Sequence, residues 1–439
     1  MRGGAAGRFR NVKLPSIYVN RHAHATRWWT TRVTGKAAAD LAGKLVTFGV
    51  TIAAARTLPA EAFGLMALAT TWGWLAGVTT DAGWSMYLAR EVARHPAAAR
   101  SLATQVVGRR GRAAVAAGLL AAAVSAARFA PEVARGVTLL VVAQLAAAVL
   151  ETSMHLFRGL ERTDVEARLH ASQRLAAGGL ALLALAIRPS LDTLGMALAL
   201  PPILAMAAAR RVTTRLTAER GTAVAAPHLD ASALRTLVWP LGFGTIVSAL
   251  YFRCDVFFIE QWHGAAVVGA YNAAFRLVDA IRLFPAAVMA VAFPSLVRAV
   301  DDGAIRRVAW PLTAVGVAAG LGTALTAPFV MHLAYGPKFD AAVTSLRLLG
   351  FAVPFFFLNY ALTHQVIAWD GQRAYLRVAL GALAVNLAAN LALVPAHGGD
   401  GAALATATTE VAVTIGCMIA LARRAPAATP AATAPEPAA

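Results

Sequence analysis

Long apolar runs separated by short polar segments dominate the chain. A helix rises 1.5 Å per residue, so about 20 apolar residues cross the ~30 Å hydrocarbon core of a membrane. The pattern therefore predicts an all-α polytopic membrane protein with about twelve transmembrane helices. The twelve runs are residues 38–56, 62–84, 112–130, 136–157, 172–188, 190–209, 236–259, 267–294, 308–331, 341–368, 375–394 and 400–421.

Basic residues gather in alternate connecting segments. With the N-terminus placed on the cytoplasmic side, the segments on that side hold thirty Lys and Arg, and the opposite segments hold five. Loops rich in Lys and Arg stay in the cytoplasm during membrane insertion. The alternation thus supports twelve spans with both termini cytoplasmic, because one missed span would scramble it downstream.

Two short similarities recur at nearly one offset. Residues 59–65 (PAEAFGL) match 264–270 (GAAVVGA), and 195–199 (GMALA) match 401–405 (GAALA), at offsets of 205 and 206. This repeat predicts two six-helix lobes related by a pseudo-two-fold axis along the membrane normal, and the alternative is chance similarity in an Ala-rich chain. The expected parts are a basic cytoplasmic arm, an N-terminal lobe, a cytoplasmic linker, a C-terminal lobe and a disordered tail, at residues 1–36, 37–215, 216–235, 236–422 and 423–439.

Composition excludes several function classes. Hydrophobic residues make up 58% of the chain and charged residues 14%, against about 25% charged in soluble domains. The net charge of +18 lies between apolar runs, where it sets orientation, so nucleic acid is not expected as a partner. Cys254 and Cys417 both fall inside apolar runs and form no metal or disulfide motif. With no nucleotide-binding loop or hydrolase motif in the sequence, we expect no enzyme, no metal and no cofactor.

Charged residues inside the runs are candidates for function, because a charge in the bilayer costs about 2.5–3.5 kcal/mol on insertion scales. Bases from runs one, seven, eight and ten predict an electropositive cavity between the lobes that binds phosphate through forked Arg donors. In the alternative interpretation, the i, i+3, i+6 spacing of three charges in run eight makes a structural ion-pair strip. The predicted substrate-binding bases are Lys44, Arg253, Arg276, Arg282 and Arg347.

Polar and acidic residues in the runs supply the remaining candidates. Asn359, Asn386 and Asn390 are predicted to contact sugar hydroxyls, and the alternative is interhelical hydrogen bonding. The candidates for carrying a coupling proton or sodium ion are Asp40, Asp279 and Glu410.

The chain resembles the Wzx-type polysaccharide and oligosaccharide flippases of the multidrug/oligosaccharidyl-lipid/polysaccharide exporter superfamily. The resemblance covers about residues 36–422. It rests on short motifs whose order and spacing run through both halves, at residues 55–64 (ARTLPAEAFG), 81–84 (DAGW), 90–91 (RE), 253–255 (RCD), 269–274 (GAYNAA), 334–339 (AYGPKF) and 398–403 (GGDGAA).

The resemblance implies a V of two lobes that moves an undecaprenyl-diphosphate-linked glycan across the bacterial inner membrane by alternating access. It points to Arg253 and Arg276 as cavity residues. The implied partners are the lipid-linked glycan and membrane lipids, with glycan polymerase and chain-length machinery as further candidates. Two rivals stay open: a cation-coupled multidrug antiporter of the same fold, and a non-transporting scaffold for glycan assembly.

Overall fold

A computed structural model describes residues 24–218, 239–298, 303–369 and 371–423, which are helical apart from short turns and contain no β-strand. Side chains of residues 24–40 lie outside that description. The helices before the 219–238 gap are α1 (His24–Thr57), α2 (Ala60–Asp81), α3 (Trp84–Arg94), η1 (Pro96–Ala98), α4 (Ala99–Arg128), α5 (Pro131–Gly159), α6 (Thr163–Ile187) and α7 (Leu191–Ala218). Those after it are α9 (Trp239–Arg253), α10 (Asp255–Ile281), α11 (Leu283–Arg298), α12 (Gly303–Tyr335), η3 (Pro337–Ala342), α13 (Val343–Ala368) and α14 (Gln372–Ala422).

Two of these helices reverse direction at a glycine. Gly264 in α10 has φ 77° and Gly398 in α14 has φ 54°, in the left-handed region that glycine enters without a Cβ clash. The two halves of α14 then pack on each other, and the Asn386 amide donates to Thr409 Oγ1 at 2.9 Å. Each helix therefore contributes to two spans.

The spans predicted at 236–259 and 267–294 are each built from two helical pieces. The first combines α9 with the start of α10, and the second combines the end of α10 with α11. The second break, at Arg282, has a clear cause. Pro285 has no N–H for the Ile281 carbonyl, and its ring crowds that carbonyl.

Counted in this way, the described helices supply the twelve predicted spans, and the all-α polytopic fold is confirmed. Seven helical segments are by themselves long and apolar enough to cross a membrane, and α14 among them holds two spans. The remaining four spans are α1, α6 and the two composite spans built from α9, α10 and α11. The prediction placed the start of the first span at residue 38, whereas α1 begins at His24, inside the expected arm.

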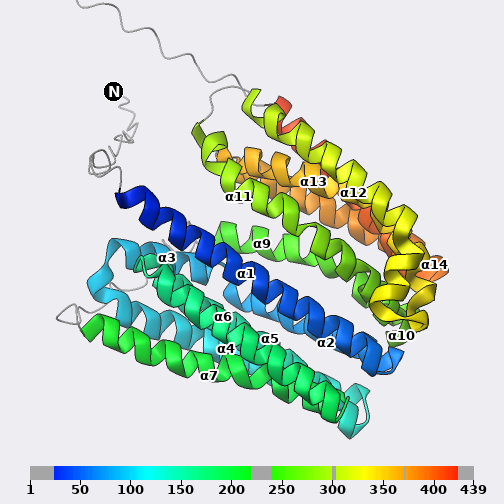
Figure 1. The fold of residues 1–439 in the computed structure, drawn as a ribbon, viewed down its shortest axis with the longest axis horizontal. Coiled ribbons are helices and arrows are strands. Elements are labelled where there is room, and N and C mark those ends of the chain that lie inside the picture. The colour runs from blue at the N-terminus through cyan, green and yellow to red at the C-terminus, as the bar shows by residue number, and fades with distance from the viewer. Residues whose placement is uncertain (1–23, 219–238, 299–302, 370, 424–439) are drawn as a thin grey trace, which may run out of the picture.

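The spans form two lobes (Figure 1). The N-lobe comprises α1–α7 and the C-lobe α9–α14, and most contacts between helices lie within one lobe. The lobes meet chiefly along α2, which packs on α9 and α10. They converge near the turns at 58–59, Gly264 and Gly336, here called the short-loop end, and diverge toward the opposite basic end.

Three predicted segments fall largely outside the described residues. These are residues 1–23 of the arm, 219–235 of the linker and 424–439 of the tail. At the basic end, α3 is an additional short helix that was not predicted. It lies along α4 and α5 and joins the second and third spans.

Candidate functional site

A cavity of about 680 Å³ lies between the lobes. The N-lobe lines it with side chains of α1, α2 and α6, and the C-lobe with side chains of α9, α10, α11 and α13. We call it the central cavity. Its charged lining consists of Lys44, Arg174, Arg276, Asp279 and Arg282.

One carboxylate serves two guanidinium groups on the C-lobe wall of the central cavity. Asp279 Oδ2 lies 3.6 Å from Arg276 Nη1, and Asp279 Oδ1 lies 3.4 Å from Arg282 Nη1. The ion-pair strip considered from the sequence is therefore present. Its two guanidinium groups share one carboxylate, so the strip has a net charge of +1. The N-lobe wall contributes Lys44 and Arg174 to the lining, which holds four basic side chains and one carboxylate in all.

Arg282 is held by aromatic faces. Its guanidinium carbon lies 4.4 Å from the Phe252 ring centre and 4.3 Å from that of Phe356. Cation–π contacts of this kind fix the plane of the group and leave its edges available for hydrogen bonds. Among the described residues, Asp279 is the one carboxylate that pairs with Arg276 and Arg282. The two guanidinium groups can therefore bind a further anion.

Arg174 was missed as a site residue, because it was assigned to the basic segment after the fourth span. It lies two residues inside the predicted run 172–188, on α6, and that position is the sequence signal that marks it. In the structure it lines the central cavity opposite Arg276.

Two predicted bases lie elsewhere. Arg253 is 5% exposed and donates to Asn272 Oδ1 at 2.9 Å and Thr71 Oγ1 at 3.3 Å, so it joins α9 to α10 and α2 behind the cavity wall. Arg347 is exposed near the start of α13 and does not line the central cavity.

The three predicted asparagines hold the C-lobe together. Asn359 donates to Glu410 Oε2 at 2.7 Å and accepts from Thr414 at 2.8 Å, linking α13 to α14. Asn386 accepts from Cys254 Sγ and from Asn390 Nδ2. None of the three lines the central cavity. The interhelical alternative describes the contacts of Asn359 and Asn386, whereas within the described residues Asn390 bonds only to Asn386, one turn earlier in α14.

The candidate ion-coupling residues differ in setting. Asp279 lines the central cavity, whereas Glu410 is buried in the C-lobe against Asn359. The side chain of Asp40 lies outside the described residues. Their predicted coupling role stays a prediction.

Contacts between the lobes close the short-loop end. Arg56 of α1 donates to the last carbonyls of α12, at Leu333 and Ala334, and Lys338 Nζ donates to the Leu58 carbonyl after α1 at 2.6 Å. Each lobe thereby places a cation on a helix C-terminus of the other, where the helix dipole is negative. Arg128 adds an ion pair across the lobes with Glu260 at 2.8 Å.

Comparison with known proteins agrees with this architecture. The lipid II flippase MurJ in an inward closed conformation has a TM-score of 0.66 at 10% identity, covering 88% of this chain and 87% of that one. A Pyrococcus furiosus transporter of the MOP superfamily, described as having a binding pocket of reversed polarity, has a TM-score of 0.62 at 14% identity, covering 89% and 94%. An inward-facing MATE multidrug resistance transporter has a TM-score of 0.57 at 17% identity, covering 87% and 94%.

At these identities the similarity shows a shared fold. A search of curated proteins by sequence finds no match. The profile of a family described as polysaccharide biosynthesis protein matches residues 34–300, which is more than half of the chain. The chain therefore belongs to the polysaccharide biosynthesis protein family.

Proposed function

We propose that the protein translocates a polyprenyl-diphosphate-linked oligosaccharide across the bacterial cytoplasmic membrane by alternating access. The observation that carries the proposal is the charge of the central cavity, where four cations from two lobes surround one carboxylate. Lys44, Arg174, Arg276 and Arg282 would bind the diphosphate, and the polyprenyl tail would stay in the lipid.

Charge and geometry favour an anionic cargo. Arg276 and Arg282 share one carboxylate, and forked guanidinium donors bind phosphate oxygens with paired, charge-assisted hydrogen bonds. A cationic drug would meet net repulsion, which disfavours the multidrug antiporter. Translocation makes and breaks no bond, so the function needs no catalytic residue.

The closed short-loop end supports alternating access. The contacts of Arg56, Lys338 and Arg128 all cross between the lobes, so opening at that end must break them. With the basic end in the cytoplasm, as charge bias favours, this conformation faces inward. Asp279 is then the candidate best placed to bind a coupling cation, because it shares the cavity with the cargo site.

The test uses a deletion strain complemented with Arg276→Gln plus Arg282→Gln, and with Arg347→Gln as the matched control. The control removes an exposed arginine of the same lobe outside the cavity. We expect the double variant to accumulate lipid-linked glycan on the inner face of the membrane at normal protein abundance, and the control to export it. Normal export by the double variant would instead support the scaffold role.

A further inference from the structure

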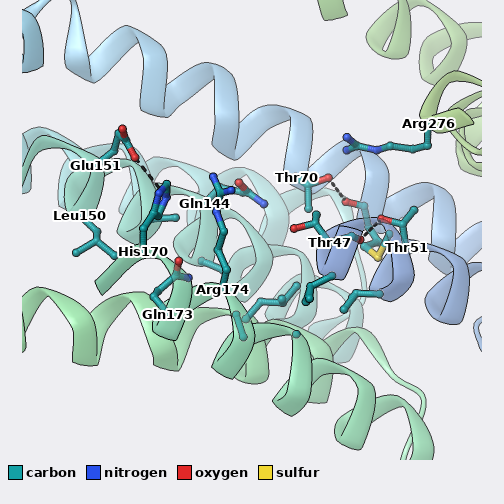
Figure 2. A pocket seen from close by; sticks show the side chains of 18 residues that line it. Thr47, Thr51, Thr70, Gln144, Leu150, Glu151, His170, Gln173, Arg174 and Arg276 are labelled. Atoms are coloured by element: carbon teal, nitrogen blue, oxygen red, sulfur yellow. Dashed lines mark hydrogen bonds and ion pairs between the residues drawn. The ribbon is translucent and has the colours of Figure 1, made fainter. Parts of the chain in front are cut away.

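A second pocket opens from the central cavity into the N-lobe (Figure 2). It has a volume of about 310 Å³ and is lined mainly by α1, α2, α5 and α6. We call it the side pocket. Thr47, Thr51, Arg174 and Arg276 line both spaces, so a ligand bound by Arg276 in the central cavity can extend directly into the side pocket.

Two glutamines give the side pocket polar groups that the protein leaves unused. Gln144 and Gln173 are half-buried and line it, and neither has a hydrogen-bond partner in the described part of the chain. Each amide offers two N–H donors and a carbonyl acceptor. An amide within a membrane span is costly unless it is hydrogen-bonded. These two are therefore suited to a ligand that both donates and accepts.

The far end of the side pocket is held in place by a network of charged side chains. Glu151 Oε2 lies 3.5 Å from His170 Nε2, and Glu151 Oε1 accepts from Arg158 Nη2 at 2.9 Å. Figure 2 shows Glu151 and His170 at one end and Arg276 at the other, with Gln144 between them. The lining thus has Arg276 at the end next to the central cavity, the amide of Gln144 beside Arg174 in the middle, and the carboxylate of Glu151 at the far end.

From this order we infer that the side pocket binds the sugar ring attached to the diphosphate, and that this sugar is neutral. The inference rests on the proposed function. Sugar hydroxyl and acetamido groups donate and accept in the way that the two amides require. A uronic acid would bring its carboxylate toward Glu151. The volume lies at the small end for ligand sites, which suits one ring, so the rest of the glycan must lie in the central cavity.

The test measures binding to the full-length protein in lipid nanodiscs with two probes: undecaprenyl diphosphate, and the same lipid bearing one N-acetylglucosamine. We expect the wild type to bind the sugar-bearing lipid about tenfold more tightly, since its sugar gains hydrogen bonds to the two amides. In Gln144→Leu plus Gln173→Leu this ratio should fall to near one, with unchanged affinity for the sugar-free lipid. Gln105→Leu, on the exposed surface of α4, should keep the wild-type ratio.

The outcomes separate this inference from the proposed function. Equal wild-type affinity for the two probes, or an equal loss of both in the double glutamine variant, overturns the sugar site alone. A failure of either lipid to bind, or unchanged binding of the sugar-free lipid by Arg276→Gln, overturns the proposed function. A probe bearing glucuronic acid should bind more weakly than the neutral one, and the reverse order overturns the neutral-sugar assignment.

Discussion

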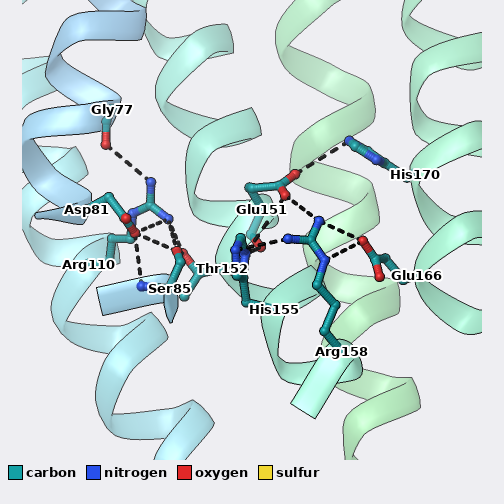
Figure 3. Close-up of polar contacts among 10 residues, drawn as sticks. All are labelled: Gly77, Asp81, Ser85, Arg110, Glu151, Thr152, His155, Arg158, Glu166 and His170. Carbon is teal, nitrogen blue, oxygen red and sulfur yellow. Dashed lines mark hydrogen bonds and ion pairs between the residues drawn. The ribbon is translucent and has the colours of Figure 1, made fainter. Parts of the chain in front are cut away.

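Two arginine sites within the helical bundle differ in how many partners the protein provides. Arg110 of α4 is 4% exposed and lies 2.9 Å from Asp81, and it also donates to Ser85, Thr152 and the Gly77 carbonyl (Figure 3). Arg276 has a single carboxylate at 3.6 Å, and it shares that group with Arg282. Both sites carry charge into the bundle, but only the second leaves charge for a ligand.

The difference separates structural arginines from binding arginines. A buried guanidinium is tolerated where most of its donors meet acceptors, as at Arg110, where only Nε has no partner within the described residues, and its removal leaves those acceptors unpaired. A guanidinium beside a cavity whose one carboxylate is shared has been positioned at some cost to stability. We therefore expect substitutions at the two sites to affect different measurements.

The largest effect is expected for Arg110→Met. Breaking one partner of a buried ion pair costs about 3–5 kcal/mol, because the remaining charge is uncompensated. The variant should show a clearly lower thermal unfolding midpoint in detergent and lower abundance. Arg112→Met, at an exposed position two residues further on, should unfold like the wild type. Adding Asp81→Asn to Arg110→Met should recover part of the loss, and an unchanged midpoint in the single variant would contradict the structural assignment.

The next largest effect is expected for Arg276→Gln. Losing charge-assisted bonds of about 1.5–3 kcal/mol should weaken binding of undecaprenyl diphosphate roughly 10- to 100-fold, measured in nanodiscs. The unfolding midpoint should stay equal to or above that of the wild type, since Asp279 keeps Arg282 as a partner. A lower midpoint with unchanged affinity would place Arg276 in the same class as Arg110.

The fold was largely predictable from the sequence because the bilayer constrains it so strongly. Backbone groups in lipid must be paired within the protein, so apolar length and the alternation of basic segments define the twelve spans. The breaks at Cys254 and Arg282 were not predicted, because an apolar run looks the same with or without a kink. Likewise, α1 extends into the basic arm, where the pattern of apolar residues does not mark the start of the helix.

The candidate site was predictable only in part. The sequence identifies a charge in a span but not the direction in which it points or the groups that it meets. Lys44, Arg276 and Arg282 reach one cavity, whereas Arg253 meets Asn272 on a neighbouring helix and Arg347 faces outward. The number of partners that a charged side chain meets depends on tertiary packing. The same limit explains the three asparagines, of which Asn359 and Asn386 bond to other helical segments of the C-lobe and Asn390 bonds to Asn386.

A third prediction concerns the contact between the lobes at the short-loop end. A Cβ on Gly64 would lie 1.6 Å from the Ala265 carbonyl oxygen, and backbone cannot move aside as a flexible side chain can. Gly64→Leu should therefore destabilise the closed state by about 1–3 kcal/mol through overpacking, and so favour the state that is open at this end. The measurement is thiol labelling of Leu58→Cys, a position that is 1% exposed here, from the outer side.

Gly49→Leu is the matched control for Gly64→Leu, because a Cβ on Gly49 meets no other atom within 4 Å. Labelling should rise in Gly64→Leu and not in the control. Equal labelling in both would show that the close approach of α2 and α10 does not hold this end closed.

The smallest effect is expected for the ion pair of Arg128 and Glu260, whose side chains are 45% and 16% exposed. Exposed pairs contribute roughly 0.2–1 kcal/mol and weaken with salt. The pair of Arg94 and Glu91 has similar exposure, 52% and 13%, but lies within α3. A double-mutant cycle of Gln variants should therefore alter Leu58→Cys labelling for the first pair and leave it unchanged for the second. Only the pair of Arg128 and Glu260 spans the lobes. Equal effects of the two cycles on labelling would mean that this pair does not select the closed state of the short-loop end.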